Sequence, residues 1–162
     1  MSTSIRLSTV KDVNVISEVL IEASLWLEEL GIPLWSQQEL QPGLIAPDTA
    51  AGRYFLAERS AHVIAVARFQ LEDPEFWPDR QAQEATFIHR LAVRRSVAGG
   101  EVSSAMLRWA VDRTRLLGRR YLRLDCDASR PRLRAVYERF GFRHHSDKQV
   151  GRYFVSLYEY EV

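Results

Sequence analysis

Hydrophobic and polar side chains alternate in several short stretches of the chain, with the two-residue period that is typical of half-buried strands. In residues 120–126, for example, Leu122, Leu124 and Cys126 share one face. Two of the apolar stretches are long enough for two strands joined by a turn, one of them near residues 59–61. The pattern predicts single strands in residues 5–9, 84–93 and 120–126, and strand pairs in residues 53–71 and 142–162.

Other stretches repeat their apolar residues with helical spacing. In residues 13–30, Ile16, Leu20 and Leu27 recur on one face, and Gly31 then ends the helix. The stretch between this helix and the first strand pair is interpreted as irregular apart from one short helix. The predicted helices are residues 13–30, 36–40 (short), 102–117 and 131–140.

The order of these elements is strand, two helices, three strands, helix, strand, helix and two strands. Such an order is typical of a mixed α/β sheet covered by helices. The sequence contains no internal repeat and no linker-like segment. We therefore expect residues 1–162 to form a single domain.

Composition narrows the class of protein. The chain has 162 residues and a net charge of +1, which argues against a protein built around nucleic acid. Its single cysteine, Cys126, fits a reducing compartment. The N-terminal residues lack a secretory signal pattern, and no apolar run approaches the length of a membrane span. A cytoplasmic protein without a membrane partner is expected.

The stretch "VRRSVAGGEVSSAML" (Val93–Leu107) joins a predicted strand to a predicted helix. Such a turn presents unpaired main-chain N–H groups at the positive end of the helix dipole, which favours an anion. Gly99 and Gly100 allow the backbone to approach a phosphate closely. Two glycines that only ease a strand into a helix are the alternative interpretation.

Three segments resemble the GCN5-related N-acetyltransferase (GNAT) superfamily: "WLEELGIPLW", "HRLAVRRSVAGGEVSSAMLRWA" and "RRYLRLDCDASRPRLRAVYERFGF". The resemblance runs from Ile5 to the end of the chain. It implies a mixed, mostly antiparallel sheet of six to seven strands flanked by about four helices. It also implies acetyl-coenzyme A as the acyl donor and, from family habit, a homodimer.

The resemblance assigns the strand, the turn and the start of the last helix to the coenzyme. The implied cofactor-binding residues are Leu91, Ala92, Val93, Arg94, Ala98, Gly99, Gly100, Glu101, Val102, Ser103, Ser104 and Arg130. The turn departs from the family pattern Arg/Gln-x-x-Gly-x-Gly/Ala. Ala98 takes the Arg/Gln position, Glu101 the first Gly and Ser103 the Gly/Ala position, while Arg130 stands where Asn is frequent. Arg94, Arg95 and Arg130 could offset the lost charge.

Acyl transfer to an amine needs a neutral amine, a polarised carbonyl and a proton for the departing thiolate. The resemblance places Tyr137, in "YERFGF", as the general acid. The base is expected on the strand before the turn, where the candidates are His89, on the face of Val93, and Glu84, on the opposite face unless a bulge intervenes. The N–H of Leu91 or Ala92 could polarise the carbonyl, and no metal site is expected.

The acceptor pocket is expected to use Trp26, Trp35 and Trp77, with core packing as the alternative for each. The preferred hypothesis is an acetyl-coenzyme A-dependent N-acetyltransferase that acts directly on a small primary amine. The first alternative is an acyl-coenzyme A-binding module with a damaged turn and little or no turnover. A nucleic-acid or protein interaction domain is the second alternative, which the near-zero net charge disfavours.

Overall fold

The computed structural model of the chain describes residues 2–78, 80–99 and 101–162. The strands are β1 (Ser4–Leu7), β2 (Tyr54–Arg59), β3 (His62–Gln70), β4 (Ala85–Val93), β5 (Tyr121–Asp127), β6 (Arg143–Val150) and β7 (Tyr153–Glu161). The α-helices are α1 (Val13–Glu29), α2 (Pro42–Ala50), α3 (Val102–Leu116) and α4 (Pro131–Phe140). Short 3-10 helices occupy Val10–Asp12, Gln38–Leu40 and Arg95–Val97. In these ranges, no helix combines the length and the apolar character that a membrane crossing requires.

The strand order of the sheet is β1-β2-β3-β4-β5-β7-β6. β4 and β5 are parallel, whereas the pairs β1–β2, β2–β3, β5–β7 and β6–β7 are antiparallel. The predicted mixed, mostly antiparallel sheet is therefore confirmed. The tight turn between β2 and β3 is also where the pattern placed it, with Ser60 and Ala61 at φ values of 52° and 64°.

The chain divides into two compact units, which are described separately. Unit 1 comprises residues 1–68 and 90–107, and unit 2 comprises residues 69–89 and 108–162. The prediction of one domain stays a prediction.

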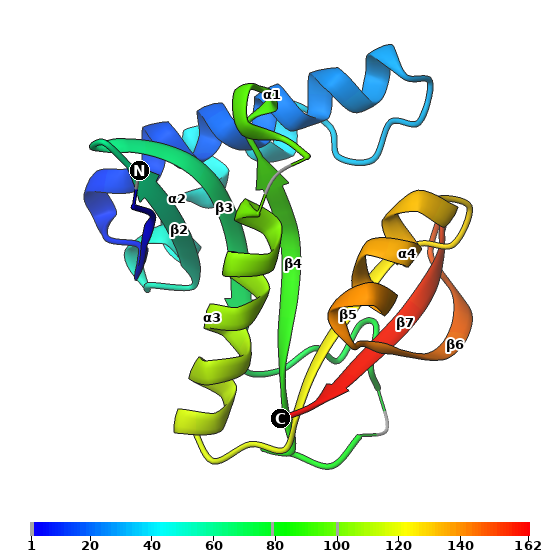
Figure 1. The fold of residues 1–162 in the computed structure, drawn as a ribbon. Helices are drawn as coiled ribbons and strands as arrows, with labels where there is room; N and C mark the ends of the chain where they lie inside the picture. The colour runs from blue at the N-terminus through cyan, green and yellow to red at the C-terminus, as the bar shows by residue number, and fades with distance from the viewer. Residues whose placement is uncertain (1, 79, 100) are drawn as a thin grey trace. The chain divides into compact units, whose positions relative to one another are not determined.

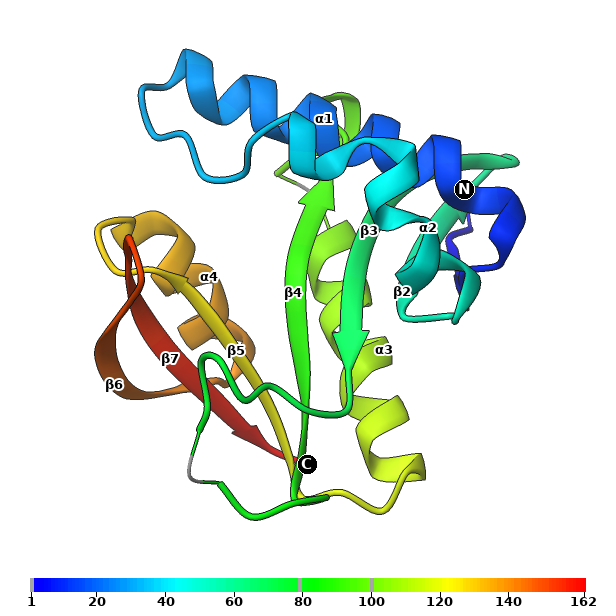
Figure 2. The same ribbon diagram turned by 180° about the vertical axis from the view of Figure 1, so that it is seen from behind.

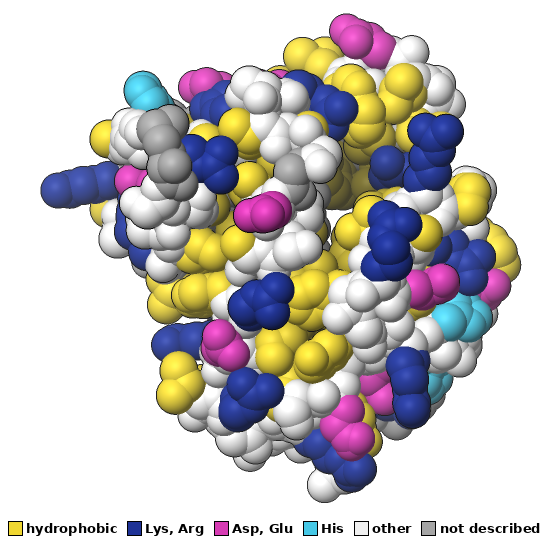
Figure 3. All heavy atoms as spheres, viewed as in Figure 1, with side chains coloured by type: hydrophobic (Ala, Val, Ile, Leu, Met, Phe, Trp, Pro, Cys, Tyr) yellow, Lys and Arg dark blue, Asp and Glu magenta, His cyan; other side chains and the backbone are white. Residues whose placement is uncertain are grey.

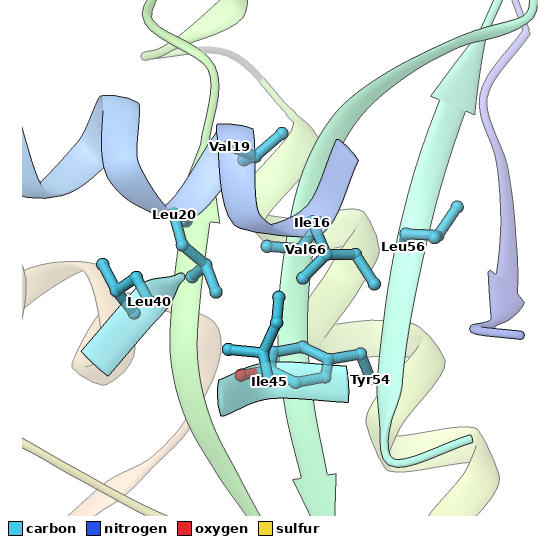
Figure 4. Close-up of a cluster of buried hydrophobic side chains, with 9 residues drawn as sticks. Ile16, Val19, Leu20, Leu40, Ile45, Tyr54, Leu56 and Val66 are labelled. Carbon is cyan, nitrogen blue, oxygen red and sulfur yellow. The ribbon is translucent and has the colours of Figure 1, made fainter. Parts of the chain in front are cut away.

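Unit 1 has its hydrophobic core between α1, α2 and the strands β2 and β3. Side chains from all four elements point toward one another (Figure 4), and α1 and α2 lie on the same side of the two strands (Figure 2). The members with at most 2% exposure are Ile16, Val19, Leu20, Leu40, Ile45, Tyr54, Leu56 and Val66. At about 1.5–3 kcal/mol for each large apolar side chain, this burial is the main stabilising contribution within the unit.

Helix α2 corrects the prediction of an irregular segment after residue 40. Pro42 occupies the first helical turn, where its missing N–H costs nothing, but Pro47 lies inside the helix and removes one main-chain hydrogen bond. Ile45 and Thr49 are nevertheless buried. Burial of this face outweighs the local preference against a helix, and sequence pattern alone could not show that.

Unit 2 is built on β5 and β7. In Figure 1 helix α4 lies on one side of these strands, and in Figure 2 the segment between β3 and β4 lies on the other. On the helix side, the ring of Tyr137 contacts those of Phe142 and Tyr158 at centroid distances of 5.9 and 6.3 Å. On the other side, Trp77 packs in a cluster with Phe87 and Leu157.

Surface charges of both signs are interspersed on the face shown in Figure 3. Arginine and lysine side chains are spread over this face and stand among acidic ones, rather than forming a single basic stripe.

Candidate active site

The turn before α3 has the backbone of an anion site. Gly99 has φ +81°, a conformation that favours glycine, and Gly100 lies outside the described residues. The N–H of Ala105 donates to the carbonyl of Glu101 at 3.0 Å, so Glu101 supplies the first carbonyl of the helix. The N–H groups of Val102, Ser103 and Ser104 precede any i−4 partner within the helix and point out of its N-terminus. Three such donors at a positive helix end can bind a diphosphate.

Glu101 itself is exposed. The repulsion between its carboxylate and a bound phosphate is therefore screened by solvent and salt. An exposed Glu101 therefore lowers the affinity of the turn for phosphate less than a carboxylate that points into the turn would.

Arg94 is engaged elsewhere in unit 1. Its Nη2 lies 2.9 Å from Glu18 Oε1, its Nη1 lies 3.3 Å from Glu22 Oε1, and its Nε donates to the carbonyl of Val63 at 2.8 Å. The guanidinium thus fastens the end of β4 to α1 and to β3. This arrangement weakens the prediction that Arg94 compensates for the missing charge at Ala98.

Glu22 also fixes the start of the turn. Its Oε2 accepts the main-chain N–H of Arg95 at 2.8 Å, while the Arg95 guanidinium stacks on the ring of Trp26 at 3.7 Å. Sequence reasoning missed Glu22, because its partners are more than seventy residues away along the chain. Its position one turn before Trp26 on the same helix was the available signal.

Tyr137 lies in the middle of α4 and is only 7% exposed. Burial, with further contributions from Cys126 and Asp125, raises the pKa of its phenol well above the ordinary value, so the hydroxyl keeps its proton at neutral pH. Within the described ranges the hydroxyl has no hydrogen-bond partner. The raised pKa keeps the proton on the oxygen and makes the phenol a weaker acid, so the case for Tyr137 as proton donor rests on its unpaired hydroxyl.

His89 is held between two carboxylates. The parallel pairing of β4 with β5 runs from Ala85–Tyr121 to Ile88–Leu124, so the next residues, His89 and Asp125, lie side by side. His89 Nδ1 is 3.2 Å from Asp125 Oδ1, and Nε2 donates to Asp73 Oδ2 at 2.7 Å.

The two carboxylates decide the charge of this histidine. His89 is 11% exposed, and Asp73 and Asp125 are 4% and 13% exposed. Burial alone would lower the pKa of His89, but Asp125 and Asp73 outweigh it and raise this pKa to about 9. At neutral pH the imidazole is therefore protonated, and the three groups together have a net charge of −1.

The same three groups are close enough to be considered as metal ligands, since one donor atom from each lies within 4.8 Å of the others. The geometry favours hydrogen bonding instead. The two ring nitrogens of His89 face different carboxylates, and the 2.7 Å contact to Asp73 is shorter than the roughly 3.3 Å between two ligand atoms on one tetrahedral zinc. An imidazolium that donates to Asp73 and forms an ion pair with Asp125 accounts for these distances.

The sequence profile of the acetyltransferase (GNAT) family matches residues 21–142. The chain belongs to the GNAT family. A curated relative, the uncharacterized N-acetyltransferase YesJ of Bacillus subtilis, is 27% identical over 140 residues, which cover 82% of this chain and 77% of the relative. The profile match confirms the family resemblance that the three sequence segments indicated.

Solved structures of acetyltransferases share the fold. A GNAT acetyltransferase from Listeria monocytogenes has a TM-score of 0.82 at 24% identity, covering 99% of this chain and 95% of that one. PaiA N-acetyltransferase from Thermoplasma acidophilum, in complex with coenzyme A, has a TM-score of 0.77 at 14% identity, covering 99% and 100%. The putative acetyltransferase yncA of Salmonella typhimurium, with acetyl-CoA, has a TM-score of 0.75 at 13% identity, covering 99% and 94%.

Arg90 interrupts the regular alternation of the GNAT strand β4. Its φ of +55° is rare for a non-glycine residue and marks a local irregularity of the strand. Its guanidinium lies 3.2 Å from the hydroxyl of Tyr54 and 3.3 Å from Glu39 Oε1. The count by twos from Val93 back to His89 passes through this irregular residue, so the shared face of His89 and Val93 stays a prediction.

Glu84, the other candidate base, lies before the first residue of β4. Its Oε1 is 3.2 Å from Nη2 of Arg123, a fully buried arginine whose Nε also donates to Glu159 at 2.7 Å. At about 3.3 Å per residue, Glu84 and His89 are roughly 16 Å apart along the strand. The structure places Glu84 in an ion pair with Arg123, and a catalytic role for Glu84 stays a prediction.

The three tryptophans predicted for the acceptor pocket have packing contacts. Trp77 is 4% exposed within the unit 2 cluster, and Trp35 packs against the unit 1 core. Trp26 lies beneath the guanidinium of Arg95. These contacts favour the packing interpretation for Trp77 and leave acceptor binding by Trp26 and Trp35 as a prediction.

The cofactor-binding roles predicted for Arg130 and for the last residues of β4 stay predictions. Arg130 directly precedes α4, and its N–H donates to the carbonyl of Asp127 at 3.2 Å. Leu91, Ala92 and Val93 form the last three residues of β4. Their cofactor role remains an expectation from the family resemblance.

Proposed function

We propose that the chain transfers the acetyl group of acetyl-CoA to the primary amine of a small molecule. Membership of the GNAT family supports acetyl transfer, and two structural relatives were solved with coenzyme A or acetyl-CoA. The observation that carries the proposal for this chain is the buried hydroxyl of Tyr137, which keeps its proton and has no partner among the described residues.

The turn before α3 is proposed to bind the pyrophosphate of the coenzyme. The N–H groups of Val102, Ser103 and Ser104 and the exposed hydroxyl of Ser104 supply donors for it. Ala98 removes the charge-assisted contact that a basic residue would give, which is worth about 1.5–3 kcal/mol. Coenzyme binding is therefore weaker than with an Arg at that position.

The acceptor is proposed to arrive as a cation. The group of Asp73, His89 and Asp125 has a net negative charge at neutral pH, which attracts an ammonium. The amine must lose a proton before it attacks the thioester carbonyl, and Tyr137 then protonates the departing sulfur. Transfer is direct, with no covalent intermediate on the protein.

Tyr137→Phe tests this function. Loss of the proton donor should lower kcat with an amine panel by about 100-fold or more, while the Kd for acetyl-CoA from calorimetry stays within a factor of two or so. Tyr158→Phe is the matched control, because that hydroxyl already donates to Glu138 at 2.5 Å and its ring belongs to the same cluster. Equal turnover in all three proteins would remove Tyr137 from the mechanism.

The departures at Ala98, Glu101 and Ser103 favour a second candidate, an acyl-CoA-binding module. The same calorimetry separates the two functions. Tight binding of acetyl-CoA without thioester loss across the whole amine panel would support the binding module, and absence of binding would contradict both functions.

A further inference from the structure

Two carboxylates contact His89 from segments that no sequence motif links to acetyl transfer. Asp73 lies in the segment after β3, and Asp125 lies in β5. We propose that Asp73 is a positioning residue for acetyl transfer, which holds His89 against Asp125 so that the three groups take up the proton of the acceptor amine as one unit. This inference rests on the proposed function.

Asp73 is itself fixed in place. Its Oδ1 accepts the N–H of Phe76 at 3.2 Å, its main-chain carbonyl accepts the N–H of Trp77 at 3.0 Å, and its Oδ2 accepts from His89. With one local hydrogen bond to its Oδ1 and 4% exposure, this carboxylate cannot turn away from the imidazole without losing contacts.

The ring of His89 is held on two edges and covered on one side. Asp73 lies at its Nε2 edge, Asp125 lies at its Nδ1 edge, and the ring of Phe76 packs on it at a centroid distance of 5.5 Å. Asp73 comes from the segment after β3 and Asp125 from β5. Among the described residues, these carboxylates are the charged groups that face His89, and each favours the imidazolium.

The proton balance of the reaction defines the task of this unit. In the form of the unit in which His89 is neutral, an ammonium gives one proton to the imidazole and becomes a neutral amine, whose nitrogen then forms the new C–N bond. The C–S bond breaks with its electron pair on sulfur, and sulfur takes a proton from Tyr137. The second proton lost by the nitrogen replaces the one that Tyr137 gave away, and the unit returns its own proton to solvent.

Asp73→Asn tests the inference, because asparagine keeps an oxygen for the Phe76 N–H but removes one charge from His89. Without that carboxylate the pKa of His89 falls, so the neutral imidazole forms at lower pH. The pH profile of kcat/KM should shift toward lower pH by about one unit or more, with the same acceptor in all proteins. Ethanolamine, putrescine and tyramine are the first acceptors, and the fastest of them is used throughout.

Two variants complete the design. Glu75→Gln removes one charge from an exposed position of the same segment and should leave the profile in place. Asp125→Asn removes the other carboxylate and should shift the profile in the same direction, which keeps the test valid if Asp73→Asn fails to fold. NMR titration of the His89 imidazole in each protein reports its protonation without requiring turnover.

The outcomes separate the inference from the function. A downward shift of both the NMR titration and the rate profile in the two aspartate variants supports the inference. If the NMR titration shifts while the rate profile stays with that of the parent protein, the inference is overturned and acetyl transfer stands. If the parent protein binds acetyl-CoA but acetylates none of the three amines, the proposed function fails, and the inference fails with it.

Discussion

The ionisation of His89 links the stability of the protein to pH. Its pKa is about 9 in the folded protein, against an ordinary value of 6.5, because two carboxylates outweigh the effect of burial. A group with a raised pKa stabilises the folded state fully below its unfolded pKa and loses that contribution as pH rises through its folded pKa. The contribution of His89 is therefore present at pH 6 and is lost between pH 6.5 and about 9.

The magnitude follows from the difference between these two values. At about 1.4 kcal/mol per pH unit, the interval corresponds to roughly 3 kcal/mol. A histidine with 11% exposure needs little correction for solvent screening. Against a typical stability of about 5–15 kcal/mol, this is a large share. The free energy of unfolding should fall by this amount between pH 6.5 and 9, beyond what the other titrating groups contribute.

His89→Gln isolates this contribution. We expect the free energy of unfolding from urea titrations, followed by tryptophan fluorescence, to depend less steeply on pH in this variant than in the parent protein. His62→Gln, which replaces an exposed histidine at the start of β3, is the matched control and should keep the parent's pH dependence. Parallel curves for the parent protein and His89→Gln between pH 6.5 and 9 would refute the reasoning, whatever the offset between them.

Three further predictions concern the turn and the strand. Ala98→Arg restores a basic side chain beside the proposed pyrophosphate and should tighten acetyl-CoA binding by about tenfold or more in calorimetry; unchanged binding would mean that the side chain at this position does not reach the phosphate. Glu22→Gln removes the ion pair with Arg94 and should weaken acetyl-CoA binding several-fold with little change in kcat, so a drop in kcat alone would contradict a positioning role. Glu84→Gln should keep turnover within about twofold, because the carboxylate is paired with Arg123; a loss of 100-fold would restore Glu84 as the base.

Much of the fold could be predicted from the period of apolar residues alone. All seven strands and the helices α1, α3 and α4 coincide with predicted segments to within a few residues, because each of them buries one regular face. Helix α2 was missed for the opposite reason. Its two prolines oppose a helix locally, and the burial of Ile45 in the core of unit 1 decides the outcome.

The candidate site was predicted less completely, since its charges are paired over long sequence separations. His89 was recognised as titratable, but Asp73 is 16 residues earlier and faces it only because of the path of the intervening segment. Asp125 faces it through the register of β4 with β5, which a single sequence does not specify. The pKa of His89 is thus raised by two carboxylates, and its chemistry depends on residues that no local pattern links to it.

In the proposed function, main-chain donors of the turn take the place of a basic side chain. Without a basic residue at Ala98, affinity for a diphosphate depends on the direction of the N–H groups at the start of α3, and an anion site of this kind works only if its backbone is fixed beforehand. Glu22 provides such fixation at the start of the turn, since one carboxylate binds both the Arg94 guanidinium and the Arg95 N–H. The exposure of Glu101 removes the main electrostatic objection. If the turn binds the coenzyme as proposed, the acids of α1 compensate for part of what the turn has lost, by holding its backbone rather than by contacting the coenzyme.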